Sequence, residues 1–382
     1  MTIQKNKTTK IGFNLSLFYF FYFAMVGVYV IFMPKVLKDL GFNSVEIGAI
    51  YTSAPIMRFL VPFVFKKYFN LNNRVFFIFL VLTFLVTLLF FSTIHNFWLY
   101  LLINLIYGSV SGVILPFADI IALDKIGKER YGKIRLWGSI GFSAIALVLG
   151  KILDGYMMAL IFLSLMALLT LITGLPLTKI DAKSNNSQSI ADNKNFSLSK
   201  FWAFWISVFL FQLSFGGFYN FFTIYETSSG LELDIVSYLW IFGVACEIVM
   251  LIVQGRFLNQ NRLLQLILIS IIATTIRWLL VAFFPTNIPL LMLSQSIHAL
   301  SFALYYSASI AYIYTLYSQK VLAQQFFLGI GFGLGGGVGA LIAGVIYKFS
   351  PKGLFIFEAF IVVVAALMLM IHQKRKEAIL ND

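Results

Sequence analysis

Seven ionisable residues lie within long apolar stretches of this 382-residue chain. If these stretches cross a bilayer, placing each charge costs at least about 2.5–3.5 kcal/mol, so each is expected to face a cavity or a partner. Carboxylates and histidine can take up protons, and arginine can bind anions or hydroxyl groups. The candidates are Arg58, Asp119, Arg135, Glu247, Arg277, His298 and Glu358.

Asp119 and Arg135 are expected to lie at the same depth on consecutive helices. Asp119 precedes Asp124 by five residues, and Arg135 follows Lys133 by two residues. With a rise of about 1.5 Å per residue, both side chains then lie within about 10 Å of one membrane boundary. Two interpretations stay open: a polar clamp on a solute at the inner end of a cavity, and a structural ion pair between two helices.

Glu247 and Arg277 are predicted to lie on the eighth and ninth membrane helices. Counted from Arg256 and Arg262 at the same boundary, their depths differ by about 9 Å, which two long side chains nearly span. A carboxylate whose positive partner comes and goes can bind and release a proton, whereas a permanent salt bridge cannot. We favour the first interpretation, in which Glu247 and Arg277 couple transport to protons.

The other intramembrane residues are less specific. His298 lies about ten residues into the tenth predicted helix, where it can titrate or simply hydrogen bond a neighbouring helix. Arg58 corresponds to Glu247 under an internal offset of 189 residues, and it is expected either to pair with Glu247 or to face a cavity alone. Glu358 follows Lys352 by six residues and is expected to reach the outer lipid headgroups.

The composition excludes several classes of protein. Apolar residues make up 60% of the chain and charged residues 11%, whereas soluble domains have about 45–50% and about 25%. A soluble enzyme, a nucleic-acid-binding module and a disordered regulator are therefore not expected. The single cysteine, Cys246, permits no intramolecular disulfide, and no metal, cofactor or catalytic residue is predicted.

Twelve apolar stretches are long enough to be transmembrane helices, each needing about 20 residues. The first stretch is too long for a signal peptide and is expected to be retained. The predicted spans are 11–33, 44–65, 75–93, 97–122, 134–150, 155–177, 201–224, 236–255, 263–284, 288–316, 322–347 and 353–372.

The basic residues predict the orientation of these spans. With the N terminus in the cytoplasm, 21 of the 28 Lys and Arg residues lie on the inner side and five on the outer side. Cytoplasmic loops of membrane proteins carry this excess. Both termini are therefore predicted to be cytoplasmic, in the inner (cytoplasmic) membrane of a bacterium.

The chain is expected to consist of two six-helix halves that form a pseudo-symmetric pair. The polar stretch 179–200 has the composition of a linker, which gives domains of 1–178 and 201–382. Gly41 and Gly230 precede Arg58 and Glu247 by the same 17 residues. Half of the residues in 329–344 are glycine, a pattern that predicts close helix packing.

The stretch 131–142, YGKIRLWGSIGF, closely resembles the start of the fifth helix in one branch of the major facilitator superfamily. That branch contains the lactose-permease-type and phenylpropionate-permease-type proton symporters. Further matches, spread over most of the chain, are Ile56–Leu60, Pro116–Asp119, Tyr238–Glu247, Ile276–Trp278 and Gln295–His298.

The resemblance implies the superfamily's twelve-helix fold and assigns roles to single residues. Asp119 and Arg135 correspond to the acid and base that bind the solute, and Glu247, Arg277 and His298 to a set that joins solute binding to protonation. Two features depart from the lactose type. Ser301 replaces the acid one turn after the histidine, and Phe65–Tyr68 replaces the acidic-glycine signature between the second and third helices. Lactose is therefore not the expected solute, and Glu247 is the preferred proton site.

These observations predict an all-α, twelve-helix secondary active transporter that carries a small organic solute with protons by alternating access. The solute is expected to be an aromatic acid, a sugar or a nucleoside, bound by Asp119, Arg135, Arg58 and His298. The expected partners are this solute, protons and lipid, with no nucleic acid, and the protein is expected to be a monomer. The alternatives are a membrane enzyme acting on lipid-linked substrates and a transporter-like receptor that binds without flux.

Overall fold

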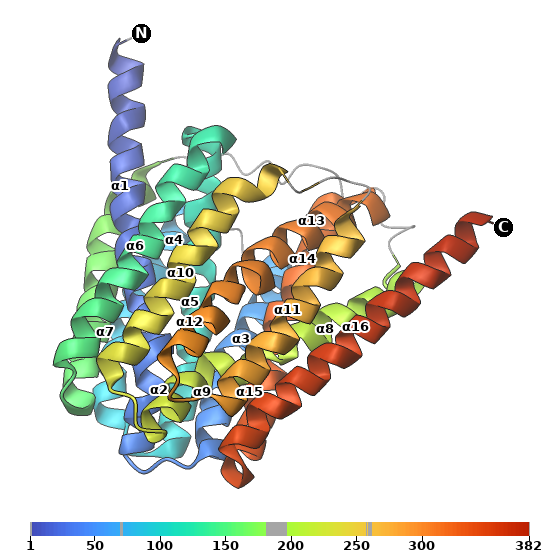
Figure 1. Cartoon of the computed structure of the whole chain (residues 1–382). Coiled ribbons are helices and arrows are strands. Elements are labelled where there is room, and N and C mark those ends of the chain that lie inside the picture. Colours follow the sequence, from blue (N-terminus) through green and yellow to red (C-terminus); the bar gives the residue numbers. More distant parts are fainter. Residues whose placement is uncertain (1, 69–71, 181–196, 257, 259–261, 382) are drawn as a thin grey trace. The chain divides into compact units, whose positions relative to one another are not determined.

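The computed structural model of the chain is helical, and no strand occurs among the residues that it describes (Figure 1). It describes all residues except 1, 69–71, 181–196, 257, 259–261 and 382. The side chains of 2–8, 61–68, 128–129, 321 and 376–381 are also outside the description. Most of the predicted linker, 179–200, therefore lies outside the described residues.

The helices coincide with the predicted spans. Eleven stretches of described residues, from Thr9–Asp39 to Pro351–Arg375, are long and apolar enough to cross a membrane. They match eleven of the twelve predictions. The remaining prediction, 44–65, matches α3 (Ser44–Tyr68), some of whose side chains are outside the described residues.

In the first half of the chain the helices follow one another with short connections. They are α1 (Thr2–Gly27), η1 (Val28–Phe32), α2 (Met33–Asp39), α3, α4 (Asn73–Thr93), α5 (Phe97–Lys125), α6 (Lys128–Ile152), α7 (Gly155–Gly174) and η2 (Leu175–Lys179).

The second half contains more interruptions within its spans. Its helices are η4 (Ser199–Phe201), α8 (Trp202–Leu213), α9 (Phe215–Ser228), α10 (Leu233–Val253), η5 (Gln254–Arg256), α11 (Leu263–Phe283), α12 (Ile288–His298), η7 (Ala299–Leu304), α13 (Tyr305–Leu316), α14 (Lys320–Phe327), η8 (Leu328–Gly335), α15 (Gly336–Phe349) and α16 (Pro351–Asn381).

The internal contacts divide the chain into two compact units. Unit 1 contains Met1–Phe42 and Ile56–Ser189, and unit 2 contains Asn43–Pro55 and Ile190–Asp382. The beginning of α3 thus packs with unit 2, although it precedes most of unit 1 in sequence. The predicted domain boundaries at 178 and 201 remain a prediction, to which the contacts add this one segment.

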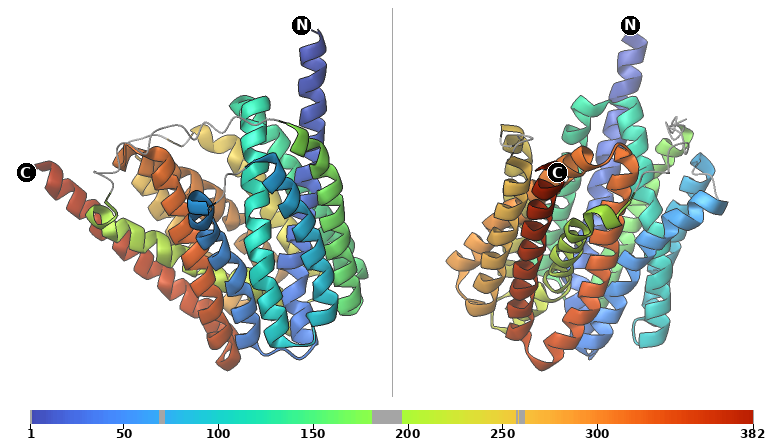
Figure 2. Two further views of the ribbon diagram at one scale, coloured as in Figure 1. Left: turned by 180° about the vertical axis from the view of Figure 1, so that it is seen from behind. Right: turned by 90° about the vertical axis from the view of Figure 1, so that its right-hand side faces the viewer.

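Within each unit a few helix pairs supply most of the packing. In unit 1, α1 lies against α6 and α7, and α4 lies against α5 and α7. In unit 2, α16 packs against α8 and α11, and α10 packs against α12 and η7. The right-hand view of Figure 2 shows α8 between α16 and η8.

Gly41 and Gly230 end helices with the same turn. Their φ angles are 94° and 109°, a region that residues with a side chain rarely adopt. In both turns the next residue's N–H donates to the carbonyl oxygen five residues earlier, at 3.0 and 3.1 Å. Because the two glycines are 189 residues apart, the predicted repeat is present in backbone geometry as well as in sequence.

A seam of glycines brings α8 and α9 into backbone contact with η8 and α15. A Cβ atom on Gly216 would overlap the backbone of Gly339 and Ala340, and one on Gly339 would overlap the carbonyl of Leu213. Any residue larger than glycine at these two positions would hold the two backbones apart. The glycine-rich segment 329–344 therefore serves close packing, as its spacing predicts.

The beginning of α3 uses the same device against α15, within unit 2. A Cβ atom on Gly48 would lie 2.6 Å from the carbonyl oxygen of Ala340 and 3.0 Å from the Cα of Gly344. The Oγ1 of Thr52 donates to the carbonyl oxygen of Gly337 at 2.9 Å. The glycines of α15 thus accept two different neighbours.

The seventh span is interrupted near its middle, at Ser214, where α8 ends and α9 begins. Gly216 and Gly217 follow, and helices commonly kink where serine and glycine occur together. The Oγ of Ser214 accepts a hydrogen bond from Nε1 of Trp278 at 3.2 Å. Because the first N–H groups of a helix have no acceptor within it, the start of α9 needs partners from elsewhere.

Candidate functional site

In unit 1 a carboxylate and a guanidinium lie among aromatic residues, in what we call the Asp119 cluster: Tyr19, Phe23, Asp119, Tyr131 and Arg135. Tyr19 of α1 donates its hydroxyl to Oδ1 of Asp119 at 2.6 Å. Tyr131 of α6 interacts with both Asp119 and Arg135. None of the described ion pairs within 4.0 Å joins Asp119 to Arg135. The two predicted residues thus share one cluster, in which tyrosine hydroxyls contact the carboxylate.

Aromatic rings hold the guanidinium of Arg135. Its Cζ lies 4.0 Å from the ring centre of Phe23 and 5.3 Å from that of Tyr19. Such cation–π contacts contribute about 0.5–2 kcal/mol. Rings on the face of a guanidinium leave its edge available for bidentate hydrogen bonds to a carboxylate. Arg135 and Asp119 are both partly exposed, so a ligand can reach them.

Two glycines of α6 create this arrangement. A Cβ atom on Gly138 would lie 2.7 Å from the Phe23 ring and 3.0 Å from Nη1 of Arg135. A Cβ on Gly141 would overlap the carbonyl oxygen of Phe20 in α1. The glycines of the stretch 131–142 thus let α6 approach α1 closely enough to seat Arg135 on aromatic rings.

Arg58, on the part of α3 that belongs to unit 1, lies over Gly112 of α5. A Cβ atom on Gly112 would be 2.8 Å from Cγ of Arg58. The Arg58 side chain is exposed, and its charge interacts with Tyr22, Tyr29 and Tyr107. Glu247, its predicted counterpart, belongs to unit 2, and within unit 1 these tyrosines are the neighbours of Arg58.

In unit 2 the three residues predicted to couple protons lie together with two neutral residues, in what we call the His298 cluster: Glu247, Arg277, Gln295, His298 and Ser301. Oε2 of Glu247 of α10 lies 3.5 Å from Nε2 of His298 of α12. His298 is 7% exposed, and its ring stacks on Phe302 with centres 5.3 Å apart. The carboxylate and the imidazole therefore lie within ion-pair distance of each other.

Arg277 is completely buried in this cluster. Its Nη2 donates to Oε1 of Gln295 at 3.1 Å, and its Nη1 donates to Oγ of Ser301 at 3.4 Å. No described ion pair within 4.0 Å joins it to Glu247. Tyr219 of α9 interacts with both. The two charges predicted to pair thus belong to one cluster without touching.

The backbone after His298 widens into a turn of π-helix, η7, which contains Ser301. Such turns often occur at functional sites because they change the face on which the following side chains lie. Here both residues face the cluster: His298 contacts Glu247, and Ser301 contacts Arg277.

Two carboxylates of unit 2 are buried although the sequence did not predict their burial. Glu358, expected at the lipid headgroups, is only 1% exposed, and its Oε1 accepts the N–H of Gly217 at 2.7 Å. That expectation is wrong because α16 turns this residue toward α9. Glu226 is completely buried near the end of α9. Its position beside the turn at Gly230 gave no sign of burial.

The sequence also did not single out the tyrosine hydroxyls of unit 1. Tyr29 donates to Oδ1 of Asn104 at 2.8 Å, and Tyr22 donates to the carbonyl oxygen of Ser111 at 3.4 Å. Tyr19, Tyr22 and Tyr29 occur at helical spacing among phenylalanines. This spacing in the sequence could have indicated that the three hydroxyl groups lie on one polar face of α1.

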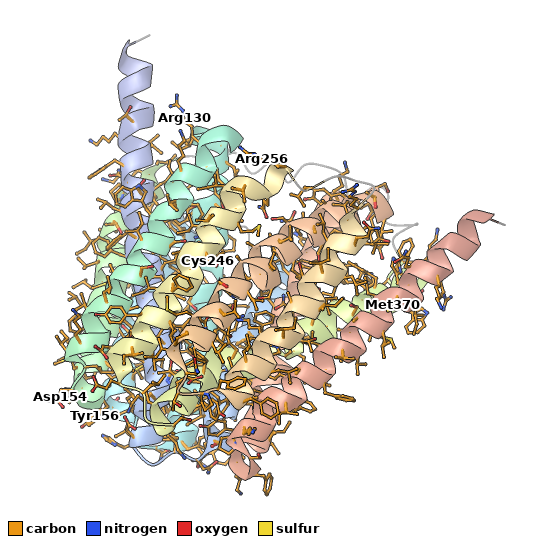
Figure 3. All side chains as sticks on the ribbon, viewed as in Figure 1. Arg130, Asp154, Tyr156, Cys246, Arg256 and Met370 are labelled. Carbon is orange, nitrogen blue, oxygen red and sulfur yellow. The ribbon has the colours of Figure 1, made fainter. Side chains whose placement is uncertain are left out.

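No group of three or more His, Cys, Asp and Glu residues suitable for a metal ion occurs in the described part of the chain. Cys246, labelled in Figure 3, directly precedes Glu247 on α10 and is a free thiol. The side chains of the two clusters can bind charged or hydroxylated groups and exchange protons.

A family model described as the MFS_1 like family matches residues 13–357. The chain is 25% identical over 352 residues to the "Probable 3-phenylpropionic acid transporter" of Escherichia coli (strain K12), which covers 89% of this chain and 92% of that protein. It is 23% identical over 290 residues to the maltose permease of Geobacillus stearothermophilus, which covers 73% and 72%.

Solved structures show the same fold. The nucleoside transporter NupG superimposes with a TM-score of 0.77 at 20% identity, covering 95% of this chain and 99% of that chain. A mutant of NupG gives a TM-score of 0.82 over the same shares. At this identity the likeness establishes the arrangement of helices.

Proposed function

Because this chain belongs to the MFS_1 like family of the major facilitator superfamily, we propose that it carries a small organic acid together with protons by alternating access. The predicted all-α major facilitator fold is confirmed. The protein is a multi-pass membrane transporter of a small-molecule solute and not an enzyme, since its relatives and structural neighbours are transporters.

The observation that carries the proton coupling is the contact between Glu247 and His298 at 3.5 Å. A proton from the outer side binds this pair when solute is bound, and it leaves on the inner side with the solute. Arg277, held by Gln295 and Ser301, keeps a positive charge beside the pair throughout. One proton carried with one carboxylate moves no net charge, so the pH gradient drives accumulation through this pair.

The proposed solute site is the Asp119 cluster together with Arg58, which belongs to the same unit. His298, the fourth residue that the sequence predicts to bind the solute, belongs to unit 2, and its contact with the solute stays a prediction. A carboxylate would bind the edge of Arg135, and a ring would pack against Phe23 and Tyr19. An aromatic acid therefore suits this cluster better than a sugar or a nucleoside. The relative whose name specifies 3-phenylpropionic acid supports the same choice.

Uptake into proteoliposomes tests the proposal. With an imposed pH gradient, the wild-type protein should accumulate 3-phenylpropionate above its external concentration. Glu247→Gln should abolish this accumulation but retain exchange of labelled for unlabelled solute, because exchange needs no net proton release. Glu232→Gln is the matched control, since Glu232 is an exposed carboxylate at the start of the same helix whose side chain makes no capping hydrogen bond.

Three results would contradict the proposal. Undiminished accumulation by Glu247→Gln would move the proton site elsewhere. Accumulation driven by a sodium gradient alone would show that sodium, and not the proton, is the coupling ion. Binding without flux would identify a receptor. We also propose that the protein is a monomer in a bacterial inner membrane with both termini in the cytoplasm, as the basic residues predict.

A further inference from the structure

Glu358 of α16 is a buried carboxylate at the helix break of the seventh span. Its Oε1 accepts the N–H of Gly217 at 2.7 Å, in the first turn of α9. A side chain on Gly217 would occupy the place of this oxygen. The carboxylate thus satisfies an N–H that α9 cannot satisfy itself, and its negative charge faces the positive end of the helix dipole.

The same carboxylate is the negative charge associated with Arg277. Glu358 and Arg277 interact, and both are almost completely buried. They contact consecutive residues of α9, since Cζ of Arg277 lies 4.1 Å from the ring centre of Phe218 and Glu358 binds the N–H of Gly217. The direct partners of Arg277, Gln295 and Ser301, are both neutral. A buried charge without a compensating charge is costly, so Glu358 compensates Arg277.

The second oxygen of Glu358, Oε2, is the atom that can accept a proton. Oε2 is buried and has no hydrogen-bond partner within 3.5 Å among the described residues, although the backbone N–H of Phe218 also interacts with the carboxylate. A buried carboxylate oxygen without a donor is where a proton adds without breaking an existing contact. Structural ion pairs instead tend to have both oxygens satisfied.

We propose that Glu358 is a second proton-binding carboxylate of the transport cycle, so that two protons accompany each solute. This inference rests on the proposed proton-coupled function. A proton from outer water bonds to Oε2 and gives a neutral carboxylic acid, while Oε1 keeps the Gly217 N–H. Arg277 and the start of α9 then lose their negative neighbour, which couples proton uptake to the helix break. Release to inner water restores the carboxylate.

The helices around Glu358 contribute few other titratable groups. Arg277 of α11 is the charged group that interacts with it. The α8 sequence contains none. The remaining titratable residues of the packed helices α9 and α15 are Tyr219, Tyr225, Glu226, Tyr347 and Lys348. Of these, Tyr225 and Tyr347 interact with Glu226, and Tyr219 interacts with Glu247 and Arg277.

Counting protons against solute tests the inference. Proteoliposomes with an internal pH indicator and labelled 3-phenylpropionate should give two protons per solute for the wild-type protein. Because two protons and one carboxylate carry one net positive charge, an inside-negative potential of 100 mV at equal pH should drive up to about 50-fold accumulation. Glu358→Gln should reduce the count to one and remove the response to the potential, while accumulation driven by a pH gradient persists.

Glu226→Gln is the matched control, because Glu226 is also completely buried and neither of its side-chain oxygens bonds a described residue. It should keep two protons per solute and the response to the potential. Loss of one proton in Glu226→Gln, with two retained in Glu358→Gln, would assign the second site to Glu226 and overturn the inference.

The wild-type protein decides the matter even if Glu358→Gln does not fold. One proton per solute, with no response to the potential, would overturn the second site and leave the proposed function standing. Absence of any accumulation driven by a pH gradient would instead remove the proposed function itself. Infrared difference spectra between high and low pH should also show one protonated carboxyl group fewer in Glu358→Gln than in the wild-type protein.

Discussion

The Asp119 cluster and the His298 cluster use similar residue types but give them different access to water. In unit 1 the charged side chains of Asp119 and Arg135 are partly exposed, and Arg58 is exposed. In unit 2 Arg277 is 0% and His298 7% exposed. A solute needs open groups to bind and leave, whereas a proton can reach groups that no larger ligand can touch. This difference supports the proposal that the Asp119 cluster binds the solute and the His298 cluster binds protons.

The largest effect is expected from Arg277→Gln. Because the charge is buried, its removal leaves Glu358 without a compensating positive group, which should cost about 3–5 kcal/mol in unfolding free energy. Adding Glu358→Gln should recover part of this loss. Thermal and denaturant unfolding in detergent measures both variants.

Arg58→Gln is the control for this experiment, since it removes an exposed arginine from a span of unit 1. It should change the unfolding free energy by less than about 1 kcal/mol. Equal losses for Arg58→Gln and Arg277→Gln would erase the contrast between the two clusters.

Arg135→Gln should have an intermediate effect, and on binding rather than on stability. Loss of a charge-assisted hydrogen bond is worth about 1.5–3 kcal/mol, which corresponds to a roughly 10–150-fold weaker apparent affinity for 3-phenylpropionate. Arg135→Lys should fall in between, because it keeps the charge but loses the planar stacking on Phe23. Concentration dependence of uptake provides the measurement.

Lys133→Gln, an exposed change on the same helix, should leave that affinity unchanged. An unaltered affinity in Arg135→Gln, together with a large loss of stability, would mean that Arg135 is structural. The structural ion-pair interpretation of this region would then be correct.

Tyr19→Phe should have the smallest effect. It removes the hydroxyl that donates to Asp119 at 2.6 Å, a bond worth about 1 kcal/mol, so the apparent affinity should fall roughly fivefold. Tyr156→Phe is the matched control, because this tyrosine lies in the first turn of α7 and its ring contacts His95. A loss of proton coupling instead of affinity in Tyr19→Phe would assign proton exchange to unit 1 as well.

Much of the fold was predictable because the hydropathy of the sequence shows the length of each membrane span and the depth of each residue within it. All twelve spans and the tight packing of 329–344 follow from composition and spacing, whereas the matching turns at Gly41 and Gly230 became visible only in the structure. Depth also sufficed for Asp119 and Arg135, since antiparallel neighbours at one depth must lie near each other. The placement of the beginning of α3 in unit 2 had no such signal, because long-range packing decides it.

Depth does not give the face on which a residue lies, and this limited prediction of the His298 cluster. Glu247 and Arg277 are close in depth, yet one points to His298 and the other to Gln295 and Ser301. The face of Glu358 was hidden because nearly every residue around it in α16 is apolar. Ser301 was recognised as the place of a missing acid, but the carboxylate that faces Arg277 comes from a different helix.

The glycine seam between Gly216 and Gly339 has a consequence for how this protein can vary. Because backbone meets backbone there, even the smallest side chain has no space. A library of random variants selected for growth on the transported solute should therefore be depleted of substitutions at the seam as strongly as at the charged residues. Positions of this protein that tolerate no substitution will therefore include sites of helix contact as well as residues that bind solute or protons.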